Sequence, residues 1–184
     1  MSFIGIEQVK KILKSTLSEK TYCHSLNTME TAMHLCYQYA GDSSVIEIAS
    51  LLHDCAKQIN SIPPEYLPLL QEFIEYPSVI HAPLGALIAQ KQFGIEDERI
   101  LNAIRYHTTG RGNMTLEEKI VFVADAIEPY RSYCGIEELR KIAEEDIDEA
   151  ILTSLMGNVE YLSKQKKAIH PLTIEAINYL MKEK

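Results

Sequence analysis

Apolar residues recur three and four positions apart along nearly the whole chain, and alternation of apolar and polar residues is almost absent. This period lines up apolar side chains on one face of an α-helix, whereas a half-buried strand needs a period of two. The first three stripes are Ile6, Val9, Ile12, Leu13 and Leu17; Leu26, Met29, Met33, Cys36 and Ala40; and Val45, Ile48, Leu52, Cys55 and Ile59. The pattern predicts an all-α fold. A length of 184 residues fits one domain, so we expect a single helical domain over residues 1–184.

Glycine, proline and capping residues indicate where the first helices begin and end. We expect Gly41 to stop the second helix, because glycine is favoured just past a helix C-terminus. Ser44 and Glu47 have the spacing of a capping box that opens the third helix. Pro83 suits the first turn of a later helix that ends at Gly94.

The remaining boundaries are indicated in the same way. Asp97 is the expected cap of one helix, and Thr115 opens another that ends at Pro129. Residues 62–77 hold four of the seven prolines, so we expect a loop there with a short helix around residues 66–75. This loop is either a plain connector or a lid.

The chain carries a net charge of −8, which disfavours nucleic-acid polymers and anionic membranes as partners because both attract basic proteins. No apolar run approaches the ~18–20 residues that cross a bilayer, and the N-terminus lacks a signal-peptide pattern. We therefore expect a cytoplasmic protein. Any phosphate ligand would have to be held by a metal or by a few local cations.

His53 and Asp54 stand side by side in an apolar segment that is expected to be helical. A buried carboxylate is costly unless it is paired with a cation or bound to a metal. Adjacent helical residues point about 100° apart, so this pair suits a ligand that lies between helices.

His24, His81, His107 and Asp125 also fall in or at the ends of apolar helical segments. Taken singly, such a histidine is more often a core or surface residue whose ring is satisfied by a carbonyl. Together with the His-Asp pair they favour a metal site, because borderline metals prefer imidazole and carboxylate and a helical bundle can aim these groups inward.

The four cysteines show no C-x-x-C spacing, and a cytosolic chain needs no disulfide from them. We expect Cys23, Cys36, Cys55 and Cys134 to be small buried hydrophobes. Because Cys23 and Cys55 each adjoin a candidate metal ligand, thiolate ligation is a minor alternative.

The order H, HD, H, H, D resembles the HD-domain superfamily of metal-dependent phosphohydrolases. The likeness is carried by the His-Asp pair, with a histidine upstream and a distant aspartate downstream on another helix. It implies an HD-domain helical bundle in which one metal is held by His24, His53, Asp54 and Asp125.

Lys57 and the stretches 81–85 (HAPLG), 105–110 (RYHTTG) and 124–131 (ADAIEPYR) carry a narrower likeness. Across nearly the whole chain they resemble the bacterial YqeK-type family of symmetrical diadenosine tetraphosphate hydrolases. This resemblance implies bound iron, as one or two ions, with manganese, cobalt, nickel or zinc as alternatives. The implied substrate is a dinucleoside tetraphosphate, which is cut into two nucleoside diphosphates.

The same resemblance implies roles for further residues. His81 and His107 would hold a second metal or contact the phosphates, and Lys57, Arg131 and Thr108 would bind phosphate and assist catalysis. Otherwise Lys57 is a solvated lysine and Arg131 part of a surface ion pair. The residues implied for nucleotide binding are Thr21, Ala168, Ile169, His170, Pro171, Leu172, Thr173 and Ile177. For the histidine among them, the alternative is a surface residue that precedes a helix.

The chemistry explains why these residue types would be needed. A polyphosphate repels a nucleophile, and a metal both neutralises its charge and lowers the pKa of a bound water toward about 7. Cations would stabilise the charge that develops on the departing diphosphate.

Two other functions stay open. One is a deoxynucleoside monophosphate phosphatase of the same superfamily, in which His81 and His107 would have no role. The other is a non-catalytic HD domain that senses nucleotides. A homodimer is compatible with all of these functions.

Overall fold

The computed structural model describes residues 5–183. Its α-helices are α1 (Ile6–Thr16), α2 (Glu19–Tyr39), α3 (Ser43–Leu52), α4 (His81–Phe93), α5 (Glu98–Tyr106), α6 (Leu116–Ile127), α7 (Ile136–Glu145), α8 (Ile147–Lys164) and α9 (Pro171–Lys182). Two short 3-10 helices, η1 (Pro64–Leu69) and η2 (Gln71–Phe73), lie between α3 and α4. Residues 5–183 contain no β-strand, so the predicted all-α fold is confirmed.

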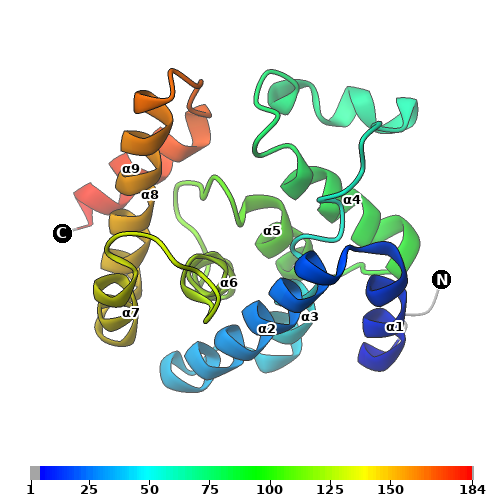
Figure 1. Ribbon diagram of the computed structural model, residues 1–184, viewed down its shortest axis with the longest axis horizontal. Coiled ribbons are helices and arrows are strands. Elements are labelled where there is room, and N and C mark those ends of the chain that lie inside the picture. Colours follow the sequence, from blue (N-terminus) through cyan, green and yellow to red (C-terminus); the bar gives the residue numbers. More distant parts are fainter. Residues whose placement is uncertain (1–4, 184) are drawn as a thin grey trace.

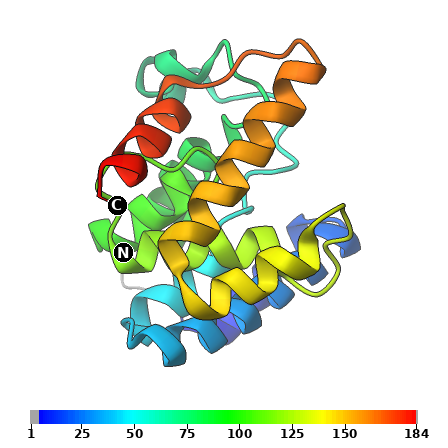
Figure 2. The same cartoon turned by 90° about the vertical axis from the view of Figure 1, so that its left-hand side faces the viewer.

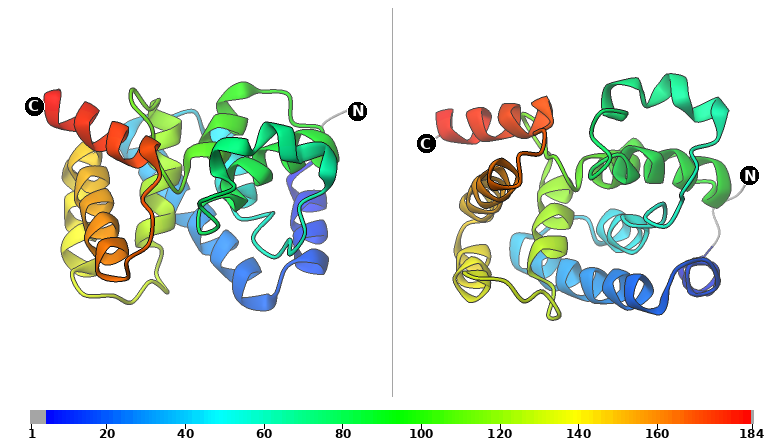
Figure 3. Two further views of the ribbon diagram at one scale, coloured as in Figure 1. Left: turned by 90° about the horizontal axis from the view of Figure 1, so that it is seen from above. Right: turned by 45° about the horizontal axis from the view of Figure 1, so that its top comes forward.

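Helix α6 lies at the centre of the molecule, and Figure 1 shows it nearly end-on. It packs against α2, α3 and α5 on one side and against α7 and α8 on the other. Figure 2 views the molecule from the side of α7 and α8, and Figure 3 shows α6 between these helices and the group formed by α3, α4 and α5. Side chains from both halves therefore meet at α6.

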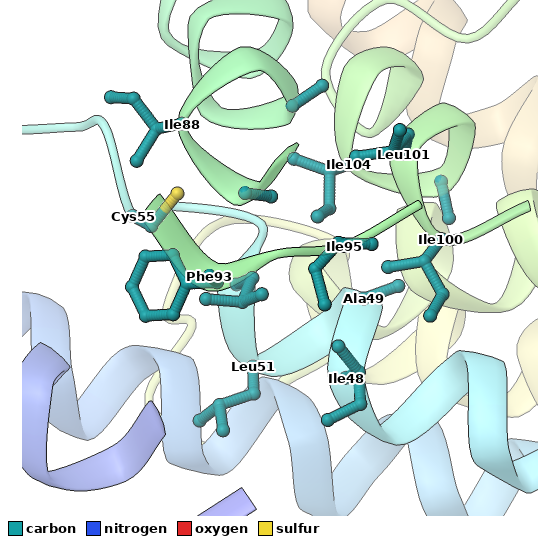
Figure 4. Close-up of a cluster of buried hydrophobic side chains, with 14 of the residues drawn as sticks. Ile48, Ala49, Leu51, Cys55, Ile88, Phe93, Ile95, Ile100, Leu101 and Ile104 are labelled. Atoms are coloured by element: carbon teal, nitrogen blue, oxygen red, sulfur yellow. The ribbon is translucent and has the colours of Figure 1, made fainter. Parts of the chain in front are cut away.

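Two clusters of buried apolar side chains form the core. The first joins α1, α3, α4 and α5, and Figure 4 shows side chains of this cluster from α3, α4 and α5 gathered between these helices. The second joins α2, α6, α7, α8 and α9. Val121 belongs to the first cluster, whereas its neighbours Ile120 and Phe122 belong to the second. A helix that is apolar on nearly all sides is typical of a buried central helix.

Several predicted helix ends are confirmed. Asp97 caps α5 and accepts a hydrogen bond at 2.9 Å from the backbone N–H two residues later. Thr115 and Glu118 form both hydrogen bonds of a capping box at the start of α6. Gly94 ends α4 with φ 69°, a left-handed conformation that favours glycine.

The end of α2 differs from the prediction. Ala40, and not Gly41, adopts the left-handed conformation after the helix, with φ 55°. A Cβ atom at Gly41 would lie 2.6 Å from Ile46 Cδ1 and 3.0 Å from Ile120 Cδ1, so the ends of these two buried side chains would have to shift. The glycine thus allows close packing of α3 and α6 against the end of α2.

The predicted capping box at Ser44 is wrong, because a cap at Ser44 would start the helix at Val45, whereas α3 begins two residues earlier, at Ser43. Asp42 is the cap, and its carboxylate accepts hydrogen bonds from the backbone N–H of Ser44 at 3.0 Å and from the Ser44 hydroxyl at 2.6 Å. An aspartate directly before the helix can accept an N–H group of the first turn that has no partner within the helix. Ser44 is therefore part of the first turn and does not act as its cap.

The helix that was predicted to carry His53 and Asp54 ends before them, at Leu52. Tight turns follow, in which the Cys55 N–H donates to the Leu52 carbonyl at 3.0 Å and the Lys57 N–H donates to the Asp54 carbonyl at 2.9 Å. The His-Asp pair therefore lies just past the C-terminus of α3, where the backbone has left the α-helical ladder.

The connection from α3 to α4 is a loop, as predicted, but it holds two 3-10 helices in place of one short helix. Ile59, which the sequence pattern assigns to the core, is 38% exposed. Among the helices between residues 5 and 183, none combines the length and apolar character needed to span a bilayer.

Two of the four cysteines are not buried. Cys36 and Cys55 are buried as predicted, but Cys23 and Cys134 are exposed, and all four are free thiols. Burial raises the pKa of Cys55 to about 12. Its thiol donates to the Gly85 carbonyl at 3.5 Å, and no cysteine belongs to either group of candidate metal ligands among residues 5–183, which argues against the thiolate ligation considered as an alternative.

Candidate metal centre

Five segments direct imidazole and carboxylate side chains toward one buried region. The contributors are His24 on α2, His53 and Asp54 after α3, His81 at the start of α4, His107 after α5, and Asp125 on α6. The ring of His53 is fully buried, and the side chain of Asp54 is only 5% exposed. All six residues that the sequence pattern groups as a metal site are brought together.

The tautomers of two histidines are fixed by their own helices. His53 Nδ1 donates to the Ser50 carbonyl at 2.6 Å, and His107 Nδ1 donates to the Ile104 carbonyl at 2.7 Å. Each histidine directly follows the last residue of a helix, where the final carbonyls have no partner within the helix. Because Nδ1 carries the proton, the Nε2 lone pair of each ring faces the site.

One group of donors surrounds His24 and His53. The two Nε2 atoms are 3.2 Å apart, and His24 Nε2 is 2.9 Å from Asp125 Oδ1. Asp54 Oδ2 lies 3.7 Å from His24 Nε2 and 3.6 Å from His53 Nε2. Two imidazoles and two carboxylates thus enclose one small volume.

A second group forms around the other oxygen of Asp54. Oδ1 lies 3.2 Å from His81 Nε2 and 3.6 Å from His107 Nε2. The donor atoms of His53, Asp54 and His107 also lie within 4.8 Å of one another. The Asp54 carboxylate therefore stands between two sets of nitrogen donors.

These residues fit a metal ion. His107 Nε2 is buried without a hydrogen bond within residues 5–183, and such an atom costs about 1–3 kcal/mol. Asp54 Oδ1 is also buried without a hydrogen bond of good geometry there, and it lies 3.3 Å from the Lys57 ammonium group. His24 Nε2 and His53 Nε2 are 3.2 Å apart, a separation that is stable only where one of the two nitrogens carries a proton or both bind a cation. A divalent transition metal would accept all of these lone pairs.

The charge state of the cluster also suits a cation. Burial lowers the pKa of His53 to about 4, so this ring is neutral at neutral pH. Burial alone would raise the pKa values of Asp54 and Asp125, but the surrounding imidazoles outweigh it and lower both. For His24, burial lowers the pKa, but the hydrogen bond to Asp125 and the negative charges of Asp125 and Asp54 together outweigh it, so the pKa is raised. Two carboxylates and a neutral imidazole are the forms that bind metal.

A protein-family model described as HD domain matches residues 21–130. This range runs from the start of α2 to just beyond the end of α6, and it contains every donor of the cluster. The chain belongs to the HD domain family. The resemblance that the sequence motifs carry is thereby confirmed.

Relatives of this HD chain match it along nearly its full length. "Bis(5'-nucleosyl)-tetraphosphatase, symmetrical" of Bacillus subtilis is 38% identical over 182 residues, which cover 95% of this chain and 97% of the relative. A protein of the same name from Halalkalibacterium halodurans is 39% identical over 178 residues, which cover 94% and 95%. A crystal structure from Clostridium acetobutylicum, described as a predicted HD superfamily hydrolase involved in NAD metabolism, is 39% identical, covers 100% of both chains and has a TM-score of 0.92.

Two cations lie at the rim of the HD site. Lys57 Nζ is 3.3 Å from Asp54 Oδ1 and 3.0 Å from His81 Nε2, and its side chain is 45% exposed. Arg131 donates to the Asp125 carboxylate and, at 2.9 Å, to the Asp125 backbone carbonyl. Both cations therefore contact the donor cluster while remaining open to solvent on their outer side.

Thr108 and Thr21, two of the threonines in the predicted site, have different surroundings. Thr108 directly follows the buried His107, and its hydroxyl is buried without a hydrogen-bond partner in the described part of the chain. Thr21 lies in the first turn of α2, where its hydroxyl is 3.0 Å from Ser18 Oγ. The Thr108 hydroxyl is thus the one that lacks a protein partner.

The segment at residues 168–173 lies against η2. His170 caps α9, stacks on the Phe73 ring at 4.5 Å between centroids, and has Nε2 3.2 Å from the Glu72 carbonyl. It is only 4% exposed, so the alternative of a surface histidine is wrong. A groove of about 450 Å³ opens beside it, lined by residues of η2, Tyr76 and the start of α9. Ile177 packs against the second core cluster.

Glu128 is a candidate that the sequence did not single out. It follows the last residue of α6, is 3% exposed and has Oε1 3.2 Å from His24 Nδ1. The sequence signal was that Glu128 is an acidic residue three positions after Asp125 and directly before Pro129. Its burial could not be predicted, because it depends on the packing of α2 against α6.

Proposed function

We propose that this HD protein is a metal-dependent hydrolase that cuts diadenosine tetraphosphate and related dinucleoside tetraphosphates symmetrically into two nucleoside diphosphates. The observation that carries this proposal is the inward convergence of imidazole and carboxylate donors, with two cations at the rim. The full-length similarity to proteins named symmetrical bis(5'-nucleosyl)-tetraphosphatase supports the substrate class.

The first metal would be held by His24, His53, Asp54 and Asp125. We propose iron, with manganese, cobalt, nickel and zinc as ions that the same nitrogen and oxygen donors accept. A bound divalent metal supplies charge neutralisation on the polyphosphate and activation of water at neutral pH. His53 is suited to this role because burial keeps its ring neutral and the Ser50 carbonyl keeps its Nε2 lone pair inward.

His81 and His107 would hold a second metal or contact phosphate directly. Their Nε2 atoms lie 3.2 Å and 3.6 Å from Asp54 Oδ1, so these two rings and that oxygen are the groups that would hold an ion on this side. A phosphate on that side would meet Lys57 as well, whose ammonium group is 3.0 Å from His81 Nε2.

The chain's cations would act on the phosphates. Lys57 and Arg131 stand at the rim, where their positive charges would stabilise the charge that develops on the departing nucleoside diphosphate. The Thr108 hydroxyl, which lacks a partner in the described chain, would donate to a phosphate oxygen. Arg131 would also hold Asp125 in place through its two hydrogen bonds to that residue.

We further propose that the nucleoside moieties contact the groove beside α9. The residues concerned are Thr21, Ala168, Ile169, His170, Pro171, Leu172, Thr173 and Ile177. The groove supports the assignment of His170, Pro171 and Leu172, which line it together with Tyr76 and Ile74 and so offer the aromatic and apolar surface that nucleoside binding needs. The other residues are assigned from the sequence resemblance.

The product identity tests the proposal. Purified protein is incubated with diadenosine tetraphosphate, the nucleotides are separated by ion-exchange chromatography, and bound metal is measured in parallel. We expect adenosine diphosphate as the sole nucleotide product. Asp54→Asn should lose bound metal and activity by more than the roughly 10–100-fold that loss of an outer-shell partner costs.

Other products would contradict the proposal in distinguishable ways. A mixture of adenosine triphosphate and monophosphate would mean asymmetric cleavage. Phosphate release from deoxynucleoside monophosphates, without cleavage of the tetraphosphate, would favour the monophosphatase. Tight binding of the tetraphosphate without turnover would favour a nucleotide-sensing domain.

A further inference from the structure

Glu128 is a buried acid whose two oxygens have different partners. Oε1 lies 3.2 Å from His24 Nδ1, and Oε2 accepts a hydrogen bond at 2.8 Å from the Tyr130 backbone N–H. The side chain is 4% exposed, so water does not compete freely for either oxygen. The carboxylate therefore joins the turn after α6 to the ring of a proposed metal ligand on α2.

His24 needs an acceptor from outside its own helix. His53 and His107 each follow a helix end and donate from Nδ1 to a carbonyl three residues earlier. His24 lies inside α2, where the preceding carbonyls accept hydrogen bonds from the helix backbone. Glu128 supplies the missing acceptor from a position 104 residues later in the chain.

The turn that carries Glu128 is held in place by Arg140 on α7. The Arg140 guanidinium donates to the carbonyls of Ile127 at 3.0 Å, of Glu128 at 2.9 Å and of Arg131 at 3.2 Å. Three hydrogen bonds from one planar group leave the turn little freedom. The position of the Glu128 carboxylate relative to α2 is therefore well defined.

We propose that Glu128 is a positioning residue for the metal centre, which holds the His24 ring in the Nδ1–H tautomer and directs its Nε2 lone pair to the metal. This inference rests on the proposed metal site. The carboxylate also strengthens the binding of a metal by His24 Nε2. An anionic hydrogen-bond acceptor at Nδ1 increases the basicity of a ligating imidazole more than a neutral backbone carbonyl does.

Glu128→Gln is the informative substitution, because the side chains have nearly the same shape. Glutamine has one acceptor oxygen, so it can serve either the Tyr130 N–H or the His24 Nδ1–H, whereas the carboxylate serves both. The NH₂ group of the glutamine would then face the other of these two N–H groups, with which it cannot form a hydrogen bond. We expect the dissociation constant for zinc(II) to rise by roughly 10–100-fold.

Glu144→Gln is the matched control. Glu144 Oε1 also pairs with a histidine of α2, lying 3.0 Å from His34 Nε2, but both side chains are about half exposed or more, at 49% and 62%. The control removes the same charge and the same type of contact away from the donor cluster. Its affinity for zinc(II) should equal that of the unsubstituted protein.

The experiment is a zinc(II) titration of metal-free protein by isothermal calorimetry, combined with ¹⁵N-detected imidazole spectra of the zinc-loaded protein. The unsubstituted protein should show His24 protonated at Nδ1, with that proton protected from exchange. Glu128→Gln should bind zinc(II) more weakly and exchange this proton faster. Equal zinc affinity in Glu128→Gln, or an Nδ1 without a proton in the unsubstituted protein, would overturn the inference.

The second of these readouts needs no substitution, so the inference stays testable if Glu128→Gln does not fold. Failure of the proposed function has a different signature, since the unsubstituted protein would then neither bind metal nor hydrolyse the tetraphosphate. A protein that does both while Glu128→Gln keeps its affinity would refute only the role of Glu128.

Discussion

The protonation of His53 gives a quantitative test of the metal centre. In the unfolded chain this ring takes up a proton near its ordinary pKa of 6.5, whereas in the fold burial lowers the pKa to about 4. Between these pH values the unfolded chain binds more protons, so the metal-free protein loses stability as the pH falls from 6.5 toward 4. At about 1.36 kcal/mol per pH unit, the loss attributable to this ring is roughly 3 kcal/mol.

The assay is urea unfolding of chelator-treated protein, followed by circular dichroism at several pH values across this range. His53→Gln has no titrating ring, so its unfolding free energy should fall less steeply with decreasing pH than that of the unsubstituted protein. His34→Gln removes an exposed histidine of α2 and should keep the original slope. The reasoning is refuted if the pH dependence of His53→Gln parallels that of the unsubstituted protein, because the ring would then be free to protonate in the fold and would not be a preset ligand.

Three further outcomes follow from the contacts. Lys57→Gln should leave the metal content unchanged and lower kcat by roughly a hundredfold, because it removes a cation from the rim of the site. An unchanged kcat in this variant would show that Lys57 has no role in catalysis. Gly41→Ala should destabilise the fold by about 1–3 kcal/mol, because its Cβ would meet buried side chains at 2.6 Å. Gly157→Ala, on an open part of α8 where a Cβ meets nothing within 4 Å, should instead stabilise it by about 0.5–1 kcal/mol. Thermal or urea unfolding of the two glycine variants measures both changes in stability. Equal changes in the free energy of unfolding would contradict the packing argument.

Local signals were sufficient for most helix positions. The caps at Asp97 and Thr115 and the stop at Gly94 depend on residues within one turn of the helix end, and all three are confirmed. The prediction of Ser44 as the cap of α3 was wrong because Asp42, two residues earlier, is the cap and accepts the backbone N–H of Ser44. Sequence alone ranks such competing acceptors poorly.

Contacts between distant helices account for what the sequence did not predict. The exposure of Cys23, the close approach at Gly41 and the burial of Glu128 all depend on which face of α2 meets α3 and α6. His170 is similar, since its ring is buried by Phe73, far away in the chain. The donor residues were recognisable because their residue types are unusual in apolar segments, whereas the groups that orient them are ordinary carbonyls or a single acid.

The end of α3 at Leu52 explains why an adjacent His-Asp pair can serve one site. In a continuous helix the side chains of His53 and Asp54 would diverge by about 100°. Because the helix stops, the His53 ring caps its own helix through Ser50, and the following turn brings Asp54 Oδ2 to 3.6 Å from His53 Nε2. The other oxygen of Asp54 then faces His81 and His107, the remaining donors of the cluster. The break in the helix thus gives the carboxylate access to both groups of donors, so a substitution that extended α3 through Asp54 would disrupt metal binding even if every donor residue were retained.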